Sequence, residues 1–241
     1  MTPALKRRLV AEAAGRFRPA GRFAHHFARG KLGADPIFPA LLEPNLIPGG
    51  TRLLDLGCGQ GLVAAWLEAA NGIHAAGDWP AALPPPPSLA RYHGIELMPA
   101  EVRRARLALG PGIDIAEGDL LSLPWPASDL ILLLDVLHYL PPDRQLAVLR
   151  RARQHLPADG RLLLRVGDAG ATLRHGWSQA VDRVVSRLRG YGDGSLHGRG
   201  LDEWAALLTR CDFEFERFAM GGGTGLPNWL FRARPGSGNP G

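Results

Sequence analysis

Two hydrophobic patterns alternate along the middle of the chain. Apolar runs of strand length predict buried strands at residues 52–56, 92–97, 113–116, 130–135 and 161–166. Apolar residues at helical spacing predict helices between them, at residues 62–70, 100–109 and 143–155. Buried strands that alternate with helices are typical of a parallel sheet with helices on both faces. The pattern therefore predicts a doubly wound α/β fold.

The flanking segments have different patterns. Near the N-terminus, apolar residues recur on one helical face, at Leu5, Leu9, Val10, Ala13 and Phe17. We expect residues 1–48 to form a helical cap or lid, and residues 49–234 to form the main domain. The proline-rich residues 75–89 predict a surface loop. Later residues predict helices at 172–188 and 201–210, a hairpin of strands 213–220 and 228–234, and a disordered tail at 235–241.

Composition and charge narrow the class of protein. The formal net charge is +5, but residues 1–31 hold eight basic residues against Glu12 alone, so the remaining chain is slightly acidic. No broad phosphate-binding face is expected, and a nucleic-acid partner is not predicted. The sequence has no apolar run long enough to span a bilayer, although the short basic helix leaves weak contact with anionic lipid open. Cys58 and Cys211 are too few for a metal cluster or a disulfide framework, so we expect a reducing cytoplasm and no bound metal.

The most informative segment joins the first predicted strand to the next helix. Residues 53–61 read Leu-Leu-Asp-Leu-Gly-Cys-Gly-Gln-Gly, so Gly57, Gly59 and Gly61 form a G-x-G-x-G turn. Dinucleotide sites use G-x-G-x-x-G, and phosphate loops end in a Lys-Ser/Thr pair where this chain has Leu62 and Val63. Glycine lets a ligand approach the backbone while amides at the helix start remain available as donors.

This turn, with Asp55 at the end of the strand, resembles the first motif of class I S-adenosylmethionine-dependent methyltransferases. The resemblance implies a seven-stranded sheet in the order 3-2-1-4-5-7-6, with the seventh strand antiparallel. It also implies S-adenosyl-L-methionine as cofactor and S-adenosyl-L-homocysteine as product. Residues 27–32 and 138–142 are similar to bacterial small-molecule methyltransferases found with aryl-polyene pathways.

The resemblance assigns roles to acids at the ends of the predicted strands. Glu96 would accept hydrogen bonds from both ribose hydroxyls, which suits a carboxylate with two oxygens. Leu97 and Met98 would line one face of the adenine. Asp119 would accept from the adenine amino group while the N–H of Leu120 donates to the ring.

The methyl-transfer end of the cofactor is assigned in the same way. The methionine carboxylate would meet the amides of the glycine turn, including Cys58, and Asp55 and Asp135 would lie near the amino-acid end and the sulfonium. His138 and Tyr139 are candidates for deprotonating or orienting an acceptor hydroxyl. Val136 and Leu137 replace the Pro-Pro of enzymes that methylate exocyclic amines of bases, so nucleic-acid N-methylation loses support.

We therefore predict methyl transfer to a small acceptor, aromatic or lipid-like. Candidate walls of the acceptor pocket are Phe23, Phe27, Arg165, Asp168, Arg174, His175, Trp177 and residues 221–225. Three other functions stay open: an NAD(P)-binding oxidoreductase, a non-catalytic partner subunit that binds S-adenosylmethionine, and an RNA methyltransferase, which steeply salt-dependent RNA binding would indicate.

Overall fold

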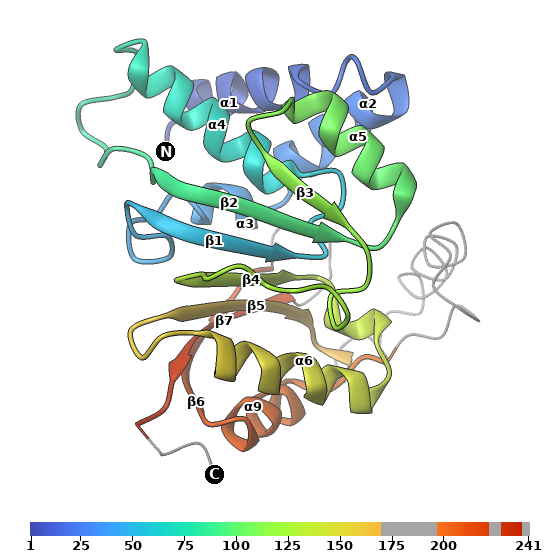
Figure 1. The fold of residues 1–241 in the computed structure, drawn as a ribbon. Coiled ribbons are helices and arrows are strands. Elements are labelled where there is room, and N and C mark those ends of the chain that lie inside the picture. Colours follow the sequence, from blue (N-terminus) through green and yellow to red (C-terminus); the bar gives the residue numbers. More distant parts are fainter. Residues whose placement is uncertain (170–196, 222–227, 238–241) are drawn as a thin grey trace. The chain divides into compact units, whose positions relative to one another are not determined.

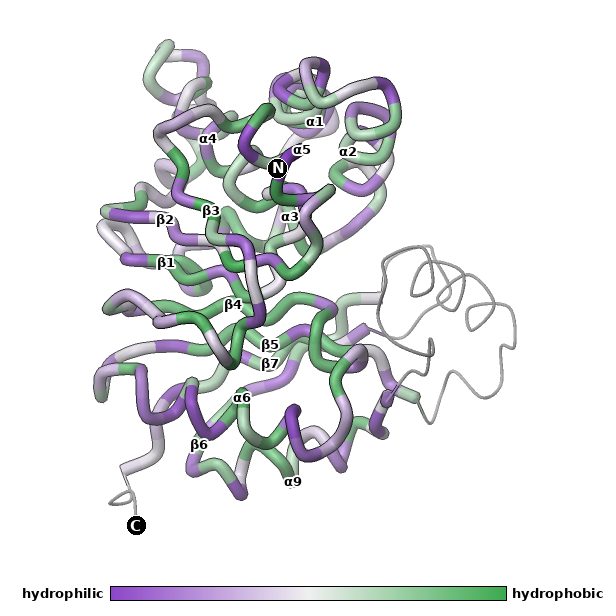
Figure 2. Tube along the Cα trace, turned by 45° about the vertical axis from the view of Figure 1, so that its right-hand side comes forward, coloured by the Kyte–Doolittle hydropathy of each residue, from purple (hydrophilic) through white to green (hydrophobic). Residues whose placement is uncertain are grey.

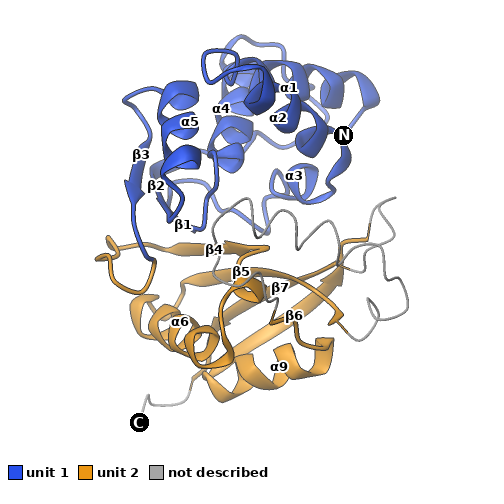
Figure 3. Cartoon of the chain, turned by 90° about the vertical axis from the view of Figure 1, so that its right-hand side faces the viewer, with its two compact units in different colours: residues 1–119 blue, residues 120–241 orange. Residues whose placement is uncertain are grey.

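The computed structural model describes residues 1–169, 197–221 and 228–237 (Figure 1). Its strands form a seven-stranded sheet in the order β3-β2-β1-β4-β5-β7-β6. The predicted doubly wound α/β fold and its strand order are therefore confirmed. The chain divides into two compact units, residues 1–119 and 120–241, which Figure 3 shows in blue and orange.

The first unit contains three parallel strands and five helices. In chain order these elements are α1 (Pro3–Gly15), α2 (Arg22–Ala34), α3 (Ile37–Ala40), β1 (Thr51–Leu56), α4 (Leu62–Ala75), β2 (Leu89–Glu96), α5 (Pro99–Leu109) and β3 (Asp114–Glu117). Strand β2 pairs with β1 on one side and β3 on the other. Figures 1 and 3 show α4 and α5 on the same side of these strands, and α1 and α2 pack against α4.

The core of this unit is centred on α4. Nine of its residues are buried, including Trp66, which has no exposed surface. The Trp66 ring lies 5.9 Å from the ring of Phe38 in α3. Residues 1–48 thus supply part of the apolar surroundings of α4, and no division between the two compact units falls at residue 48. That residues 1–48 act as a lid stays a prediction.

The described residues of the second unit form four strands, two α-helices and a short 3₁₀ turn. Its elements are β4 (Leu130–Leu134), the 3₁₀ turn η1 (Leu137–Tyr139), α6 (Pro142–His155), β5 (Arg161–Gly167), α9 (Leu201–Arg210), β6 (Phe213–Ala219) and β7 (Asn228–Pro235). Strand β4 is hydrophobic throughout, as the green tube in Figure 2 shows. Strand β7 runs antiparallel to both β5 and β6, as the resemblance implied.

Some predicted boundaries were wrong. Helix α4 continues to Ala75 rather than residue 70, because Ile73 is buried and the Asn71 side chain donates to the carbonyls of Leu67 and Pro87 instead of ending the helix. Strand β2 begins three residues early, at Leu89. These extra residues are held by tertiary contacts that the local pattern does not report.

The C-terminal boundary also differs from the prediction. Strand β7 ends at the buried Pro235, and the N–H of Gly236 donates to the carbonyl of Asp212 at 2.8 Å. The predicted disordered tail therefore does not start at residue 235. Residues 238–241, the predicted helix 172–188 and residues 222–225 of the predicted loop lie outside the described residues. Among the described residues, no helix combines the length and apolar character needed to cross a membrane.

Candidate functional site

The glycine turn between β1 and α4 has a backbone that side chains rarely adopt. Gly57, Gly59 and Gly61 have φ values of 73°, 56° and 80°. A Cβ added to Gly61 would lie 2.5 Å from Cδ1 of Leu109, whereas a Cβ on Gly59 would meet no atom within 4 Å. Gly61 is therefore required for packing against α5, while Gly59 leaves open space beside the backbone.

Hydrogen bonds attach this turn to the neighbouring strand. The N–H groups of Gly57 and Cys58 both donate to the carbonyl of Ile95, at 2.8 and 3.2 Å. The helix that follows, α4, begins without a side-chain cap. The first N–H groups of α4 therefore donate to no capping side chain. Uncapped N–H groups at a helix N-terminus are a common binding site for anions.

Glu96, the last residue of β2, lies beside this turn with 4% of its surface exposed. Its Oε2 accepts from the N–H of Gly59 at 2.8 Å, and its Oε1 accepts from the N–H of Met98 at 2.9 Å. Both carboxylate oxygens are thus oriented by backbone amides. The structure brings together three residues that the sequence analysis placed at one site.

The adenine candidates continue from this point. The N–H of Gly118 donates to the carbonyl of Glu96 at 2.9 Å, because β2 and β3 end in register at Glu96 and Glu117. This bond joins the end of β2 to the turn that leads to Asp119, the last residue of the first unit. Leu97 is 44% exposed, so its apolar side chain is available to a planar ring.

Asp55 is buried at the base of the same turn, with 2% of its surface exposed. Burial raises its pKa to about 7, although the Tyr92 hydroxyl lowers it by donating to Oδ2 at 2.6 Å; the charge of Glu96 adds to the rise. Tyr92 was missed by sequence reasoning, since its apolar position in β2 indicated only burial. The carboxyl group is therefore close to its titration midpoint at neutral pH.

Cys58 has a packing role in the turn. A Cβ at Gly94 would lie 2.7 Å from the Cys58 sulfur, so Gly94 provides the space that this thiol occupies. Burial, with the charges of Asp55 and Glu96, raises the pKa of the Cys58 thiol well above its ordinary value. A thiol held in its neutral form is a poor nucleophile.

Gln60 is a further residue that the sequence analysis did not select. Its Nε2 donates to the carbonyl of Ala24 in α2 at 3.2 Å, and only 2% of the residue is exposed. Its Oε1 is buried without a hydrogen-bond partner among the described residues. A buried acceptor without a donor is unfavourable by about 1–3 kcal/mol, so this oxygen is suited to a donor that a ligand brings.

In the second unit, Asp135 follows β4 directly and has a φ of 60°. Its N–H donates to the carbonyl of Arg165 at 3.1 Å, and its Oδ1 lies 3.3 Å from the Arg165 Nε. Arg165 is only 3% exposed, so its side chain supports Asp135 and does not line an open acceptor pocket as the sequence analysis expected. His138 and Tyr139 lie in η1, and their ring centres are 4.1 Å apart.

The other candidates for the acceptor wall are only partly described. Phe23 is 66% exposed and stacks on Phe27, and the guanidinium of Arg104 lies over the Phe23 ring at 4.9 Å. Asp168 is half-buried. Arg174, His175 and Trp177 lie outside the described residues.

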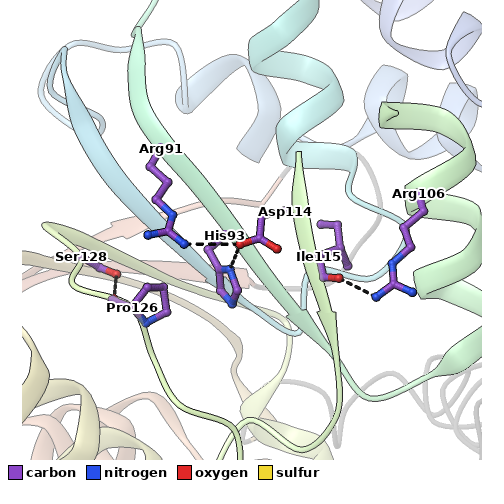
Figure 4. A network of polar contacts seen from close by, with 7 residues as sticks. All are labelled: Arg91, His93, Arg106, Asp114, Ile115, Pro126 and Ser128. Carbon is purple, nitrogen blue, oxygen red and sulfur yellow. Dashed lines mark hydrogen bonds and ion pairs between the residues drawn. The ribbon is translucent and has the colours of Figure 1, made fainter. Parts of the chain in front are cut away.

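A separate polar network lies along β2 and β3 (Figure 4). Asp114 accepts from Nδ1 of His93 at 2.7 Å and from Arg91 at 3.5 Å. Burial raises the pKa of Asp114, but the hydrogen bonds and charges of His93 and Arg91 outweigh it, so the net pKa is lowered. The network joins side chains of neighbouring strands, and no group of three metal ligands is found in the described part of the chain.

Known proteins are similar to the part of the chain that holds the glycine turn. Residues 54–162 match a family model described as a methyltransferase domain. The chain is 33% identical over 120 residues to a carboxy-S-adenosyl-L-methionine synthase of Chromohalobacter salexigens, covering 48% of the chain and 39% of that protein. It is 28% identical over 174 residues to a 27-O-demethylrifamycin SV methyltransferase of Amycolatopsis mediterranei, covering 69% and 55%.

The solved structures agree on the fold. An O-methyltransferase family protein from Burkholderia thailandensis is 17% identical, with a TM-score of 0.62, covering 92% of this chain and 63% of its own. The chain spans about two fifths and about half of the two curated relatives. The sequence motifs, the strand order and the family match agree: residues 54–162 match a methyltransferase domain, and the sheet has the strand order that the resemblance to class I S-adenosyl-L-methionine-dependent methyltransferases implied.

Proposed function

We propose that the protein transfers a methyl group from S-adenosylmethionine to a small acceptor of aromatic or lipid-like character. The observation that carries the proposal is the position of Glu96. Its carboxylate is oriented by the N–H groups of Gly59 and Met98, at the point where the glycine turn meets the end of β2. A carboxylate has two acceptor oxygens, which suits the two adjacent hydroxyl donors of a ribose.

The residues around the turn also fit the amino-acid end of the cofactor. That end carries a carboxylate, which only accepts hydrogen bonds, and an ammonium, which only donates them. The uncapped start of α4 supplies N–H donors for the carboxylate. The buried Oε1 of Gln60 and the carboxyl of Asp55 supply acceptors for the ammonium.

When bound, the cofactor supplies an activated methyl group on a sulfonium. The residues of this chain would contribute mainly by orientation, because an in-line displacement is faster when donor and acceptor are held collinear. In this proposal Asp135 faces the cationic end, and His138 and Tyr139 orient or deprotonate the acceptor hydroxyl. The compact η1 turn holds both side chains close together, which supports this assignment.

Two observations favour a small-molecule acceptor. One curated relative is named for 27-O-demethylrifamycin SV as its acceptor. The excess of basic residues is confined to residues 1–31, and Arg8 there is paired with Glu12 and Asp78 at 2.8 Å each. These pairs reduce the positive surface available to nucleic acid.

Calorimetric titration with S-adenosylhomocysteine tests the cofactor site. We expect Glu96→Ala to weaken binding about tenfold to hundredfold, because hydrogen bonds to a charged group contribute about 1.5–3 kcal/mol. Gly59→Val should also weaken binding, since its side chain fills the open space beside the turn. The matched control is Glu68→Ala, which removes a carboxylate from the exposed side of α4 and should bind like the wild type.

Transfer of labelled methyl groups into fractionated cell extract, followed by mass spectrometry, tests the reaction. A labelled small product and release of S-adenosylhomocysteine would support methyl transfer. Cofactor binding without any labelled product would instead support the non-catalytic subunit, and a carboxylated nucleoside would contradict methyl transfer. Fluorescence enhancement of NADH with no binding of S-adenosylhomocysteine would favour the oxidoreductase.

A further inference from the structure

The loop that follows Asp119 is held by one arginine of helix α6. Arg151 donates from Nη1 to the carbonyls of Leu120 and Leu121, at 3.1 and 2.7 Å. Its Nη2 donates to the carbonyl of Leu123 at 2.6 Å. Three carbonyl groups within four residues are therefore bound by a single planar guanidinium.

Trp125 completes this arrangement. The Arg151 guanidinium lies 4.3 Å from the centre of the Trp125 ring, and the indole N–H donates to the carbonyl of Leu120 at 2.8 Å. The Leu120 carbonyl thus accepts from two side chains. One turn further along α6, His155 contacts the edge of the Trp125 ring and the carbonyl of Pro126.

The chemistry of arginine suits this task. Its five N–H donors are arranged in a rigid plane and remain charged at any ordinary pH, and charged donors form stronger hydrogen bonds. A lysine has one ammonium on a flexible stem and cannot reach three carbonyls in the same geometry. Helix α6 is itself a firm support, because Val148, Leu149 and Ala152 are fully buried.

We propose that Arg151 is a positioning residue that sets the selectivity of the cofactor site for adenine. This rests on the proposed function and on the roles that the family resemblance assigns, in which the N–H of Leu120 donates to the adenine ring and Asp119 accepts from its amino group. Because Arg151 and Trp125 both bind the Leu120 carbonyl, they restrict rotation about the Leu120 backbone and so help to fix the direction of its N–H. The donor and the neighbouring acceptor are then held in the order that adenine requires.

The base analogue that tests this idea is hypoxanthine. Adenine presents a donor and an acceptor side by side, whereas hypoxanthine presents an acceptor and a donor in the reverse order. A site with ordered hydrogen-bonding groups rejects such an analogue far more strongly than a loose one does. Binding of S-adenosylhomocysteine is therefore compared with binding of S-inosylhomocysteine, by calorimetry.

We expect the wild type to bind S-adenosylhomocysteine more tightly than S-inosylhomocysteine. Arg151→Met should lower the affinity for S-adenosylhomocysteine about tenfold and leave the affinity for S-inosylhomocysteine almost unchanged, so that the preference is lost. Arg151→Lys should restore part of the preference. Trp125→Phe, which keeps an aromatic ring and removes the indole N–H donor, should reduce the preference by less. Arg150→Met is the matched control, because Arg150 is an exposed neighbour on the same helix.

Equal weakening of both ligands in Arg151→Met, or an unchanged preference, would overturn the inference. If Arg151→Met does not fold, the Trp125→Phe and Arg151→Lys preferences decide in its place. Failure of the wild type to bind S-adenosylhomocysteine at all would remove the proposed function instead. The two failures are therefore distinguishable in one set of titrations.

Discussion

Asp55 combines almost complete burial with a single hydrogen bond from Tyr92. Burial disfavours the charged carboxylate, and the nearby Glu96 adds to this effect, so the pKa rises from 3.8 to about 7. A ligand ammonium at this point would favour the charged form. The residue is thus suited to respond to a cationic ligand, at some loss of stability in the protein alone.

The pH dependence of unfolding tests this state of Asp55. Its pKa is raised on folding, so its contribution to stability is complete below about pH 4 and is lost as the pH rises through about 7. We expect urea unfolding at steps from pH 4.5 to 8 to show that the free energy of unfolding of the wild type falls with pH more steeply than that of Asp55→Asn. The difference between the two slopes should reach about 1.4 kcal/mol per pH unit. Asp159→Asn, at an exposed position, should keep the wild-type slope. Parallel curves for the wild type and Asp55→Asn would contradict the assignment.

At the scale of elements, α6 organises the turn that carries the proposed catalytic side chains. Gln145 is fully buried, and its Nε2 contacts the carbonyls of Leu137, Leu140 and His197 at 3.0, 2.9 and 2.8 Å. Its Oε1 accepts from the Nε of Arg199 at 2.6 Å. One side chain therefore joins both ends of η1 to a segment more than fifty positions later in the sequence.

Removal of this amide should loosen η1. We expect Gln145→Met to lower the free energy of unfolding by about 2 kcal/mol or more, because it leaves buried carbonyls without a donor. Gln154→Met on the exposed side of the same helix should change it by less than about 0.5 kcal/mol. Hydrogen exchange should quicken at Tyr139 and Leu140, while affinity for S-adenosylhomocysteine stays near the wild-type value. Unaltered exchange at these amides would show that Gln145 does not hold the turn.

At the scale of the whole molecule, the first 48 residues belong to the core of the first unit. Leu9, Leu32 and Leu41 have no exposed surface, and α1 packs against both α2 and α4. The Gln60 side chain also binds the carbonyl of Ala24, which connects α2 to the glycine turn. These contacts argue that the segment stabilises the turn.

Truncation to residues 49–241 tests this dependence. The shortened chain would expose Trp66 and the apolar surface around it, so we expect aggregation on size-exclusion chromatography and a red shift in tryptophan fluorescence. The full-length Arg8→Ala variant, which removes only exposed ion pairs, should remain monodisperse to the same degree as the wild type. A truncated chain that stays folded and binds S-adenosylhomocysteine normally would show that residues 1–48 are a separable lid.

The candidate site was predictable where chemistry and local conformation coincide. Positive φ values favour glycine, so the spacing of Gly57, Gly59 and Gly61 was enough to identify the turn. Glu96 was predictable as an acid at the end of a strand. Tyr92 and Gln60 were not, because a buried tyrosine and a loop glutamine have no local signal that names their partners.

The sequence by itself determined the alternation of strands and helices, the glycine turn and the family, because these depend on hydrophobic period and backbone conformation within short segments. Tertiary structure decided which polar groups meet. Tyr92 reaches Asp55 across 37 positions, and Arg151 reaches Leu120 across 31. Such pairs form because the fold brings together residues that are far apart in the sequence. A pattern of buried and exposed positions along the chain does not indicate which distant residues will be in contact.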